Sequence, residues 1–421
     1  MPNYTRTKRA CFFTYIAMAP IFVLPSMLFL TFRQTYGISY TLLGSLVLVN
    51  FCTQMTIDLL FTFFSRFFNI RATVRVMPLL TTVGLLLYAI LPWVLPSHLT
   101  YLGLVIGTVI FSISAGLSEV LVSPIVAAIP SKHPERDMSL LHSIYGWGVV
   151  GSVLVCSLYF LTVGTRHWQY LVLLLATLPL ITATLFFLSP IPDLNPQSAE
   201  APSSRRSRGR TVGIALCAVC IFLGSCAENT MTNWISGFME SALGLPKAVG
   251  DLLGLAVFAL LLATTRVLYA KYSPSILKTL LVSMIGASVC YLLTGLSPSV
   301  LLSFLSCILL GVFTAMLWPG TLILMEERIP MPGVAAYALM AACGDMGASV
   351  APQMLGIVVD RIAASEFARR MSLTASVTPE EIGMKIGMLI AAIFPILGTG
   401  LVLYIIRYYK KQARAEQKSG I

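Results

Sequence analysis

Long apolar runs are the feature that most limits how this chain can fold. Charged residues and Pro/Gly-rich stretches separate about twelve such runs, many of them roughly 18 residues or longer. A helix of that length crosses about 30 Å of hydrocarbon. The sequence therefore predicts an all-α membrane protein, with transmembrane helices at about 11–31, 41–64, 74–95, 101–129, 138–163, 168–189, 211–239, 248–270, 276–296, 300–325, 334–359 and 384–406.

The charge content excludes a water-soluble globule. Only 11% of the residues are charged, whereas an average soluble protein has roughly 25%. The formal net charge is +11, which in a soluble chain would indicate a nucleic-acid partner. In a membrane protein the excess of basic residues instead fits the enrichment of Lys and Arg in cytoplasmic loops. We therefore expect the lipid bilayer as a partner and no nucleic acid.

The distribution of basic residues predicts the orientation. An even number of spans places both termini on one side, and that side carries 21 of the 28 Lys and Arg residues when it is assigned to the cytoplasm. Positive charge in short loops marks the cytoplasmic face. We therefore expect a multi-pass protein of the cell membrane with both termini in the cytoplasm.

One Pro/Ser/Arg-rich segment divides the chain into two halves. Its composition is typical of a flexible linker, so we predict six helices in 1–189, a cytoplasmic linker at 190–210 and six helices in 211–421. The end of span 2 (Ser65-Arg66) is echoed at the end of span 8 (Thr265-Arg266). Two repeated six-helix bundles are the architecture of major facilitator transporters, which bind substrate between the halves.

Several ionisable residues lie inside the predicted spans. A charged group at the bilayer centre costs at least about 2.5–3.5 kcal/mol, so each one needs a function or a partner. Glu119, Glu228 and Asp345 are the candidates for proton coupling. The alternatives are a helix-packing hydrogen bond for Glu119, a structural polar cluster for Glu228 and a packing role for Asp345.

Four further polar residues are interpreted as gating or structural groups. Asp58 lies two turns before Arg66, which favours an ion pair near the cytoplasmic end of span 2. His142 is close to the start of span 5, where an interfacial or capping role is expected. Arg266 occupies the place in span 8 that Arg66 occupies in span 2.

Polar and aromatic residues within the spans are candidates for substrate binding. Tryptophans in membrane proteins usually lie at the interfaces, yet three of them occur inside the spans. Aromatic rings stack on sugar rings, and acids and amides hydrogen-bond sugar hydroxyls; the alternative is that the large rings only fill the core. The predicted substrate-binding set is Glu119, Tyr145, Trp147, Glu228, Asn229, Trp234 and Trp318.

Over its whole length the chain resembles the major facilitator superfamily, and within it the fucose–galactose–proton symporter family. The family's Gly-x-x-Glu…Pro pattern in span 4 is matched by Gly116, Glu119 and Pro124. The resemblance implies that Glu119 takes part in proton coupling and sugar recognition. Further matches lie in 141–146, in Gly224…Glu228…Trp234, in Trp318-Pro319 and in Ala351-Pro352…Gly356…Asp360. The superfamily's loop motif after span 2 is reduced here to 65–71, and span 1 has no acid.

These observations predict a secondary active transporter that takes up a small polar solute, such as a sugar, together with protons. We expect Glu119 and Glu228 to face one shared central cavity with at least one tryptophan on its wall. The alternatives are an exporter of drugs or metabolites with the same fold, and a transporter-like sensor or lipid-handling protein. The sequence does not distinguish protons from sodium as the coupling ion. No enzyme motif occurs, so we expect no enzyme activity, no cofactor and no metal site, and a monomer is expected to suffice.

Overall fold

The computed structural model describes residues 4–64, 67–131, 134–192, 208–272, 274–329, 334–375 and 377–419. In these residues twelve helical segments are long and apolar enough to cross a membrane, which confirms the predicted all-α membrane fold. The predicted limits of the spans lie close to the observed ones, although the first and last helices are longer than predicted.

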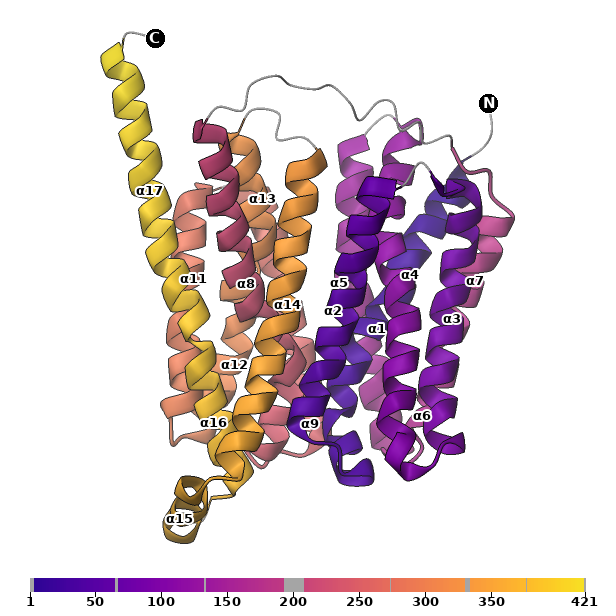
Figure 1. Cartoon of the computed structure of the whole chain (residues 1–421), viewed down its shortest axis with the longest axis vertical. Coiled ribbons are helices and arrows are strands. Elements are labelled where there is room, and N and C mark those ends of the chain that lie inside the picture. The colour runs from indigo at the N-terminus through magenta and orange to yellow at the C-terminus, as the bar shows by residue number, and fades with distance from the viewer. Residues whose placement is uncertain are drawn as a thin grey trace.

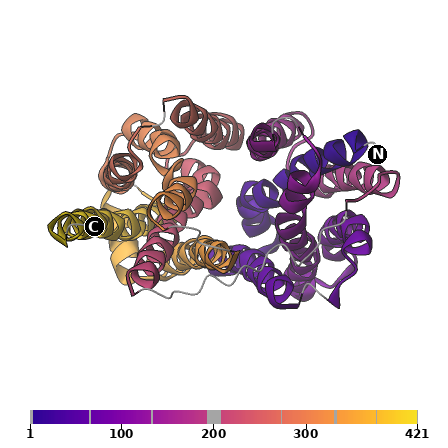
Figure 2. The ribbon, with the colours of Figure 1, turned by 90° about the horizontal axis from the view of Figure 1, so that it is seen from above.

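The first six spans gather into one bundle and the last six into another, as Figures 1 and 2 show. The first bundle, here the N-half, contains α1 (Thr5–Tyr36), α2 (Tyr40–Phe64), α3 (Ile70–Val94), α4 (Thr100–Ala128), α5 (Pro134–Thr162), and α6 (Trp168–Leu175) with α7 (Thr177–Phe187). The second, here the C-half, contains α8 (Arg208–Ser241), α9 (Lys247–Val249), the π-helical turn Gly250–Ala256 with α10 (Val257–Tyr272), α11 (Ile276–Leu296), α12 (Val300–Thr314), α13 (Leu317–Arg328), α14 (Val334–Ala363), α16 (Pro379–Ala391) and α17 (Ile393–Ser419).

Three spans contain a break that the sequence did not predict. Single turns at Ala176, at 315–316 and at Ala392 divide the sixth, tenth and twelfth spans into two helices each. A short helix, α15 (Glu366–Ala375), lies outside the bundles in the connection between α14 and α16, at the end opposite the two termini (Figure 1). Most of the predicted linker, 193–207, lies outside the described residues, so the boundaries of the two halves stay a prediction.

The first and last helices define the two ends of the molecule. Helix α1 begins and α17 ends at the same end of the bundles, here the terminal end (Figure 1). Consequently α1 ends, and α2 begins, at the opposite end. The two halves are tied together at that opposite end by charged groups and by close packing of α2 against α14.

The charged contacts involve one arginine and two acids. Arg33, at the end of α1, lies 3.2 Å from the carboxylate of Glu380 and 3.9 Å from that of Asp360. The Asp360 carboxylate also accepts hydrogen bonds from the backbone N–H groups of Tyr40 and Thr41, at 3.2 and 2.6 Å. An acidic side chain of the C-half thus caps the N-terminus of α2, a position that favours negative charge.

Close approach of α2 and α14 depends on glycine. A Cβ atom built on Gly356 would lie 2.3 Å from the backbone oxygen of Tyr40, and one on Gly44 would lie 2.9 Å from the Cα atom of Gln353. Both neighbours are main-chain atoms, so a side chain at either glycine would force the helices apart. The two helices therefore lie side by side across the boundary between the halves.

We expect Gly356→Ala to destabilise the protein by about 1–3 kcal/mol, the usual cost of overpacking a tight contact. The matched control is Gly151→Ala in α5, because a Cβ atom there meets nothing within 4 Å. Thermal unfolding of the two purified variants is the measurement. Equal melting temperatures would contradict the proposed role of the glycine contact.

Candidate functional site

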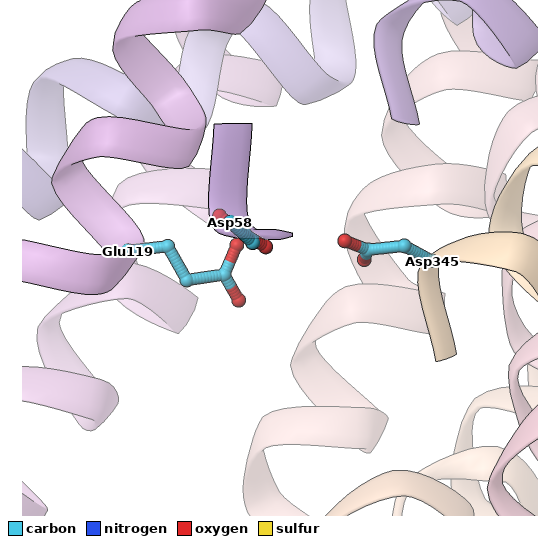
Figure 3. A group of neighbouring side chains, drawn as sticks. All are labelled: Asp58, Glu119 and Asp345. Carbon is cyan, nitrogen blue, oxygen red and sulfur yellow. The ribbon is translucent and has the colours of Figure 1, made fainter. Parts of the chain in front are cut away.

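Three carboxylates from both halves meet inside the membrane-spanning region. Asp58 lies on α2, Glu119 on α4 and Asp345 on α14, and one carboxylate oxygen of each lies within 4.8 Å of the others. Figure 3 shows Glu119 and Asp345 extending toward each other from opposite sides, with Asp58 between them. We call these three residues the carboxylate triad. It combines two residues predicted for proton coupling with one predicted for gating.

The three side chains differ in exposure. Asp58 and Asp345 are buried, at 8% and 4% exposed, whereas Glu119 is exposed. Because the exposed carboxylate of Glu119 lies beside two buried carboxylates of neighbouring helices, it faces the boundary between the halves and not lipid. Arg66, the predicted partner of Asp58, lies outside the described residues. The side chain of His142 also lies outside them.

A strip of polar side chains on α2 leads to the triad from the opposite end. Asn50, Gln54 and Asp58 are spaced by four residues, so they share one face of the helix, and all three are buried. The Gln54 amide donates to the Asn50 side-chain oxygen at 3.0 Å, and the Ser112 hydroxyl of α4 donates to the same oxygen at 2.6 Å. Sequence reasoning missed Asn50 and Gln54, although their four-residue spacing in an apolar span was a usable signal.

Close packing of α4 on α2 places Glu119 beside Asp58. A Cβ atom on Gly116 would lie 3.0 Å from the Ile57 side chain and 3.1 Å from the Gln54 backbone oxygen. Gly116 lies nearly one turn before Glu119, on a neighbouring part of the helix surface. The small residue therefore lets the two helices approach where their acids meet.

A second polar strip, on α8, supports Asp345 from the C-half. Ser225, Asn229 and Asn233 again follow a four-residue spacing. The Ser225 hydroxyl donates at 2.6 Å to the backbone oxygen of Gly344, the residue before Asp345. The Asn229 amide donates to the Ser225 hydroxyl at 3.1 Å, and the Asn233 amide donates to the Asn229 backbone oxygen at 2.9 Å. This network fixes the position of Asp345 along the axis of α8.

Trp318 packs beside the same segment of α14. A Cβ atom on Gly344 would lie 2.2 Å from the Trp318 ring, so the indole lies directly against the backbone that carries Asp345. Three residues further along, α14 approaches α8, since a Cβ atom on Gly347 would lie 2.5 Å from the Phe222 backbone oxygen. Asp345 is therefore held between two close helix contacts.

Glu228 and Arg266 form an ion pair that the sequence did not predict. The guanidinium lies 3.1 and 3.4 Å from the two carboxylate oxygens of Glu228. Its Nε donates at 2.9 Å to the backbone oxygen of Ala315, in the break between α12 and α13. The sequence assigned Glu228 to coupling and Arg266 to gating. In the structure the two residues are paired with each other.

Tyr145 lies within electrostatic range of both the ion pair and the triad. Its ring makes edge contacts with Tyr15 and Phe22 of α1, at 6.2 and 5.9 Å between centroids. The charges that act on its hydroxyl include Glu119 of the N-half and Glu228 with Arg266 of the C-half. Both predicted glutamates therefore lie in electrostatic reach of one tyrosine at the boundary between the halves.

The other two tryptophans lie elsewhere. Trp147 is 66% exposed, and it follows Tyr145 by two residues, which turns it about 200° away around the helix. Trp234 is 1% exposed; its indole N–H donates to the Pro352 backbone oxygen at 3.1 Å, and its ring packs against Phe29. The structure therefore brings Trp318, but not Trp147 or Trp234, to the triad.

A family model decides the classification. The model of the Major Facilitator Superfamily matches residues 10–352. The chain belongs to this superfamily. Its members are transporters, and the predicted superfamily is thereby confirmed, whereas the fucose–galactose–proton symporter family is not. No curated protein matches the sequence.

Solved structures of transporters share the fold at low sequence identity. One is a bacterial homolog of the human lysosomal transporter Spinster, inward-facing and unoccupied, with a TM-score of 0.76, 11% identity, and 96% of this chain and 98% of that chain covered. A D-xylose–proton symporter has a TM-score of 0.71 and 15% identity, with 93% of this chain and 96% of that chain covered. The fucose–proton symporter of E. coli has a TM-score of 0.55 and 13% identity, with 94% of this chain and 99% of that chain covered. At these identities the similarity shows the fold alone.

Proposed function

We propose that this member of the superfamily is a secondary active transporter that takes up a small polar solute, such as a sugar, in symport with protons. The observation that carries the proposal is the carboxylate triad, which joins acids of α2 and α4 to an acid of α14. Acids within a membrane are costly and mark ion or substrate pathways. In a two-bundle transporter, the site between the halves is where coupling ions act.

The triad gives a physical reason for coupling. Two like charges that face each other across the halves repel, and the repulsion grows as the surroundings lose water. A proton on Glu119 or Asp345 removes that repulsion, so the halves can close at the terminal end around a loaded site. A transporter that carries solute but no proton keeps the repulsion and closes less readily, whereas the empty site is filled with water, which screens the repulsion and lets the empty transporter return. Solute movement thereby follows proton movement.

The polar groups near the triad suit a hydroxyl-bearing solute. The Tyr145 hydroxyl, the Asn229 amide and the Glu228 carboxylate supply donors and acceptors from both halves. Trp318 supplies a flat apolar ring beside Asp345. We therefore assign these residues to solute binding and leave Trp147 and Trp234 out. A D-xylose–proton symporter and a nucleoside transporter share the fold, which supports this solute class.

The contacts between the halves support an inward-facing state. The charged ties of Arg33, Asp360 and Glu380 hold the opposite end together, whereas Glu119 is exposed. The Spinster homolog with the same fold is described as inward-facing. We therefore propose that the terminal end is cytoplasmic, in the cell membrane, and that one chain suffices for transport because both halves of the site belong to it.

The solute class is tested by thermal unfolding of the purified protein with a panel of sugars, nucleosides and organic cations. A ligand that binds only the folded state raises its apparent stability. We expect a saturable increase in melting temperature with at least one sugar or nucleoside. Stabilisation by hydrophobic cations alone would instead support an exporter.

The orientation is tested with single added cysteines. Leu373→Cys on α15, where the native side chain is 83% exposed, should react with a membrane-impermeant maleimide on intact cells. Lys411→Cys, exposed near the end of α17, should react only after permeabilisation. Seven of the nine native cysteines are buried, which keeps the background low. The reverse labelling pattern would overturn the proposed orientation.

A further inference from the structure

We propose that the carboxylate triad is a binding site for a hard metal cation of the size of Na⁺ or Ca²⁺, held between the two halves. The inference rests on the proposed function only in treating the triad as the coupling site. Binding itself requires neither a solute nor transport. Hard cations select oxygen ligands, and the three residues offer carboxylate oxygens alone.

The spacing of the oxygens fits one shared ion. Calcium binds oxygens at about 2.3–2.6 Å, so two oxygens on one ion are separated by at most about 4.6–5.2 Å. One carboxylate oxygen of each triad residue already lies within 4.8 Å of the other two. Three oxygens 4.8 Å apart would lie about 2.8 Å from their common centre, so an ion of this size reaches all three with only small side-chain adjustments. Mg²⁺, which binds at about 2.0–2.1 Å and demands octahedral geometry, fits less well.

A buried, unpartnered oxygen points independently to a ligand. Asp345 is 4% exposed, and its Oδ2 has no hydrogen-bond partner among the described residues. Buried polar atoms in native structures nearly always have a partner, so an orphan calls for an explanation. Figure 3 shows this carboxylate directed at Asp58 and Glu119. A cation in the triad supplies the missing partner.

The charge balance of the site favours the same conclusion. Within the described part of the chain, no Lys or Arg lies at ion-pair distance from Glu119 or Asp345, and the nearby guanidinium of Arg266 is bonded to Glu228. Two carboxylates this close repel each other strongly in a low-dielectric environment. A metal cation between them replaces that repulsion with attraction on both sides. Since Glu119 and Asp345 belong to different halves, the bound ion also links the halves.

The test is thermal unfolding of the full-length protein in detergent, with choline chloride replaced stepwise by NaCl, CaCl₂ or MgCl₂ at constant ionic strength. We expect a saturable rise in melting temperature with Na⁺ or Ca²⁺ and a smaller response to Mg²⁺. A response to Na⁺ alone identifies a monovalent site, and a response to Ca²⁺ alone a divalent one. Asp345→Asn and Glu119→Gln should each weaken the apparent affinity at least about tenfold, the effect of losing about 1.4 kcal/mol of binding.

Glu228→Gln is the matched control, because it removes an acid of the same region outside the triad and leaves an oxygen for Arg266. Each variant's unfolding in choline shows that it is folded. No saturable response of the native protein to Na⁺ or Ca²⁺ would overturn the site, as would an unchanged response in Asp345→Asn or an equal response to Mg²⁺. Proton-driven uptake is measured separately, so failure of the cation site and failure of the proposed function are distinguishable.

Discussion

Glu119→Gln is expected to abolish solute accumulation driven by a proton gradient. Glutamine resembles a permanently protonated glutamate, so the variant carries no proton between the two sides. With one proton per solute, a gradient of one pH unit supports about tenfold accumulation, and the variant should reduce this ratio to about one. Exchange of solute across the membrane should persist, because the neutral form is the one that crosses.

The measurement is uptake of a labelled solute into proteoliposomes with an imposed pH gradient. Glu366→Gln is the control, because this acid lies on α15, outside both bundles, where it pairs only with neighbouring arginines of the same helix. Uphill uptake by Glu119→Gln at the level of the control would remove Glu119 from the coupling mechanism.

Arg266→Gln is expected to have a large effect on stability as well as on transport. The substitution leaves the Glu228 carboxylate, which is largely buried within the C-half, without its cationic partner. It also removes the donor that reaches the Ala315 backbone oxygen in the break between α12 and α13. Leaving buried polar groups unpaired costs about 1–3 kcal/mol each, and the partial exposure of the Arg266 side chain, 37%, argues for the lower part of that range.

The double variant Glu228→Gln/Arg266→Gln provides the check. Two amides can hydrogen-bond each other, and no unpaired charge remains, so the double variant should unfold at a higher temperature than Arg266→Gln alone. Thermal unfolding of the native protein, both single variants and the double variant gives the coupling between the two residues. A double variant no more stable than Arg266→Gln would contradict the structural importance of the pair.

The spans could be predicted from the sequence because each one is a continuous physical signal. An apolar run such as 276–296 has the length of the hydrocarbon layer, and the structure has a helix of the same limits, Ile276–Leu296. The breaks at Ala176 and Ala392 were not predictable in this way. Hydropathy does not change across them, but a proline follows each break by three residues, Pro179 and Pro395. Proline has no N–H for the helix hydrogen bond and its ring clashes with the carbonyl four residues earlier, so the breaks had a local signal that hydropathy does not carry.

The acids could be identified, but their association could not. Glu119 and Asp345 stood out as acids in apolar helices, yet nothing in their sequence positions shows that α4 and α14 approach each other. Asp58 was assigned to Arg66 because helix periodicity reports only neighbours on the same helix. Its proximity to Glu119 and Asp345 depends on the contact of α2 with α14 across the two halves.

The tryptophans illustrate the same limit. Trp147, Trp234 and Trp318 look alike as aromatic residues inside apolar spans. Only their partners separate them: an exposed surface for Trp147, the Pro352 carbonyl for Trp234 and the backbone beside Asp345 for Trp318. Burial and hydrogen bonding between helices distant in sequence decide such roles, and neither is encoded in local pattern.

Proton flux coupled to solute entry is the most direct test of the central claim. Proteoliposomes that contain a pH-sensitive dye, with no initial pH gradient, receive an inward gradient of the solute found by thermal unfolding. Symport predicts that the lumen becomes acidic as the solute enters, and that the change disappears in Glu119→Gln but not in Glu366→Gln. A lumen that becomes alkaline, as in an antiporter, or solute entry with no change in lumenal pH would contradict the account.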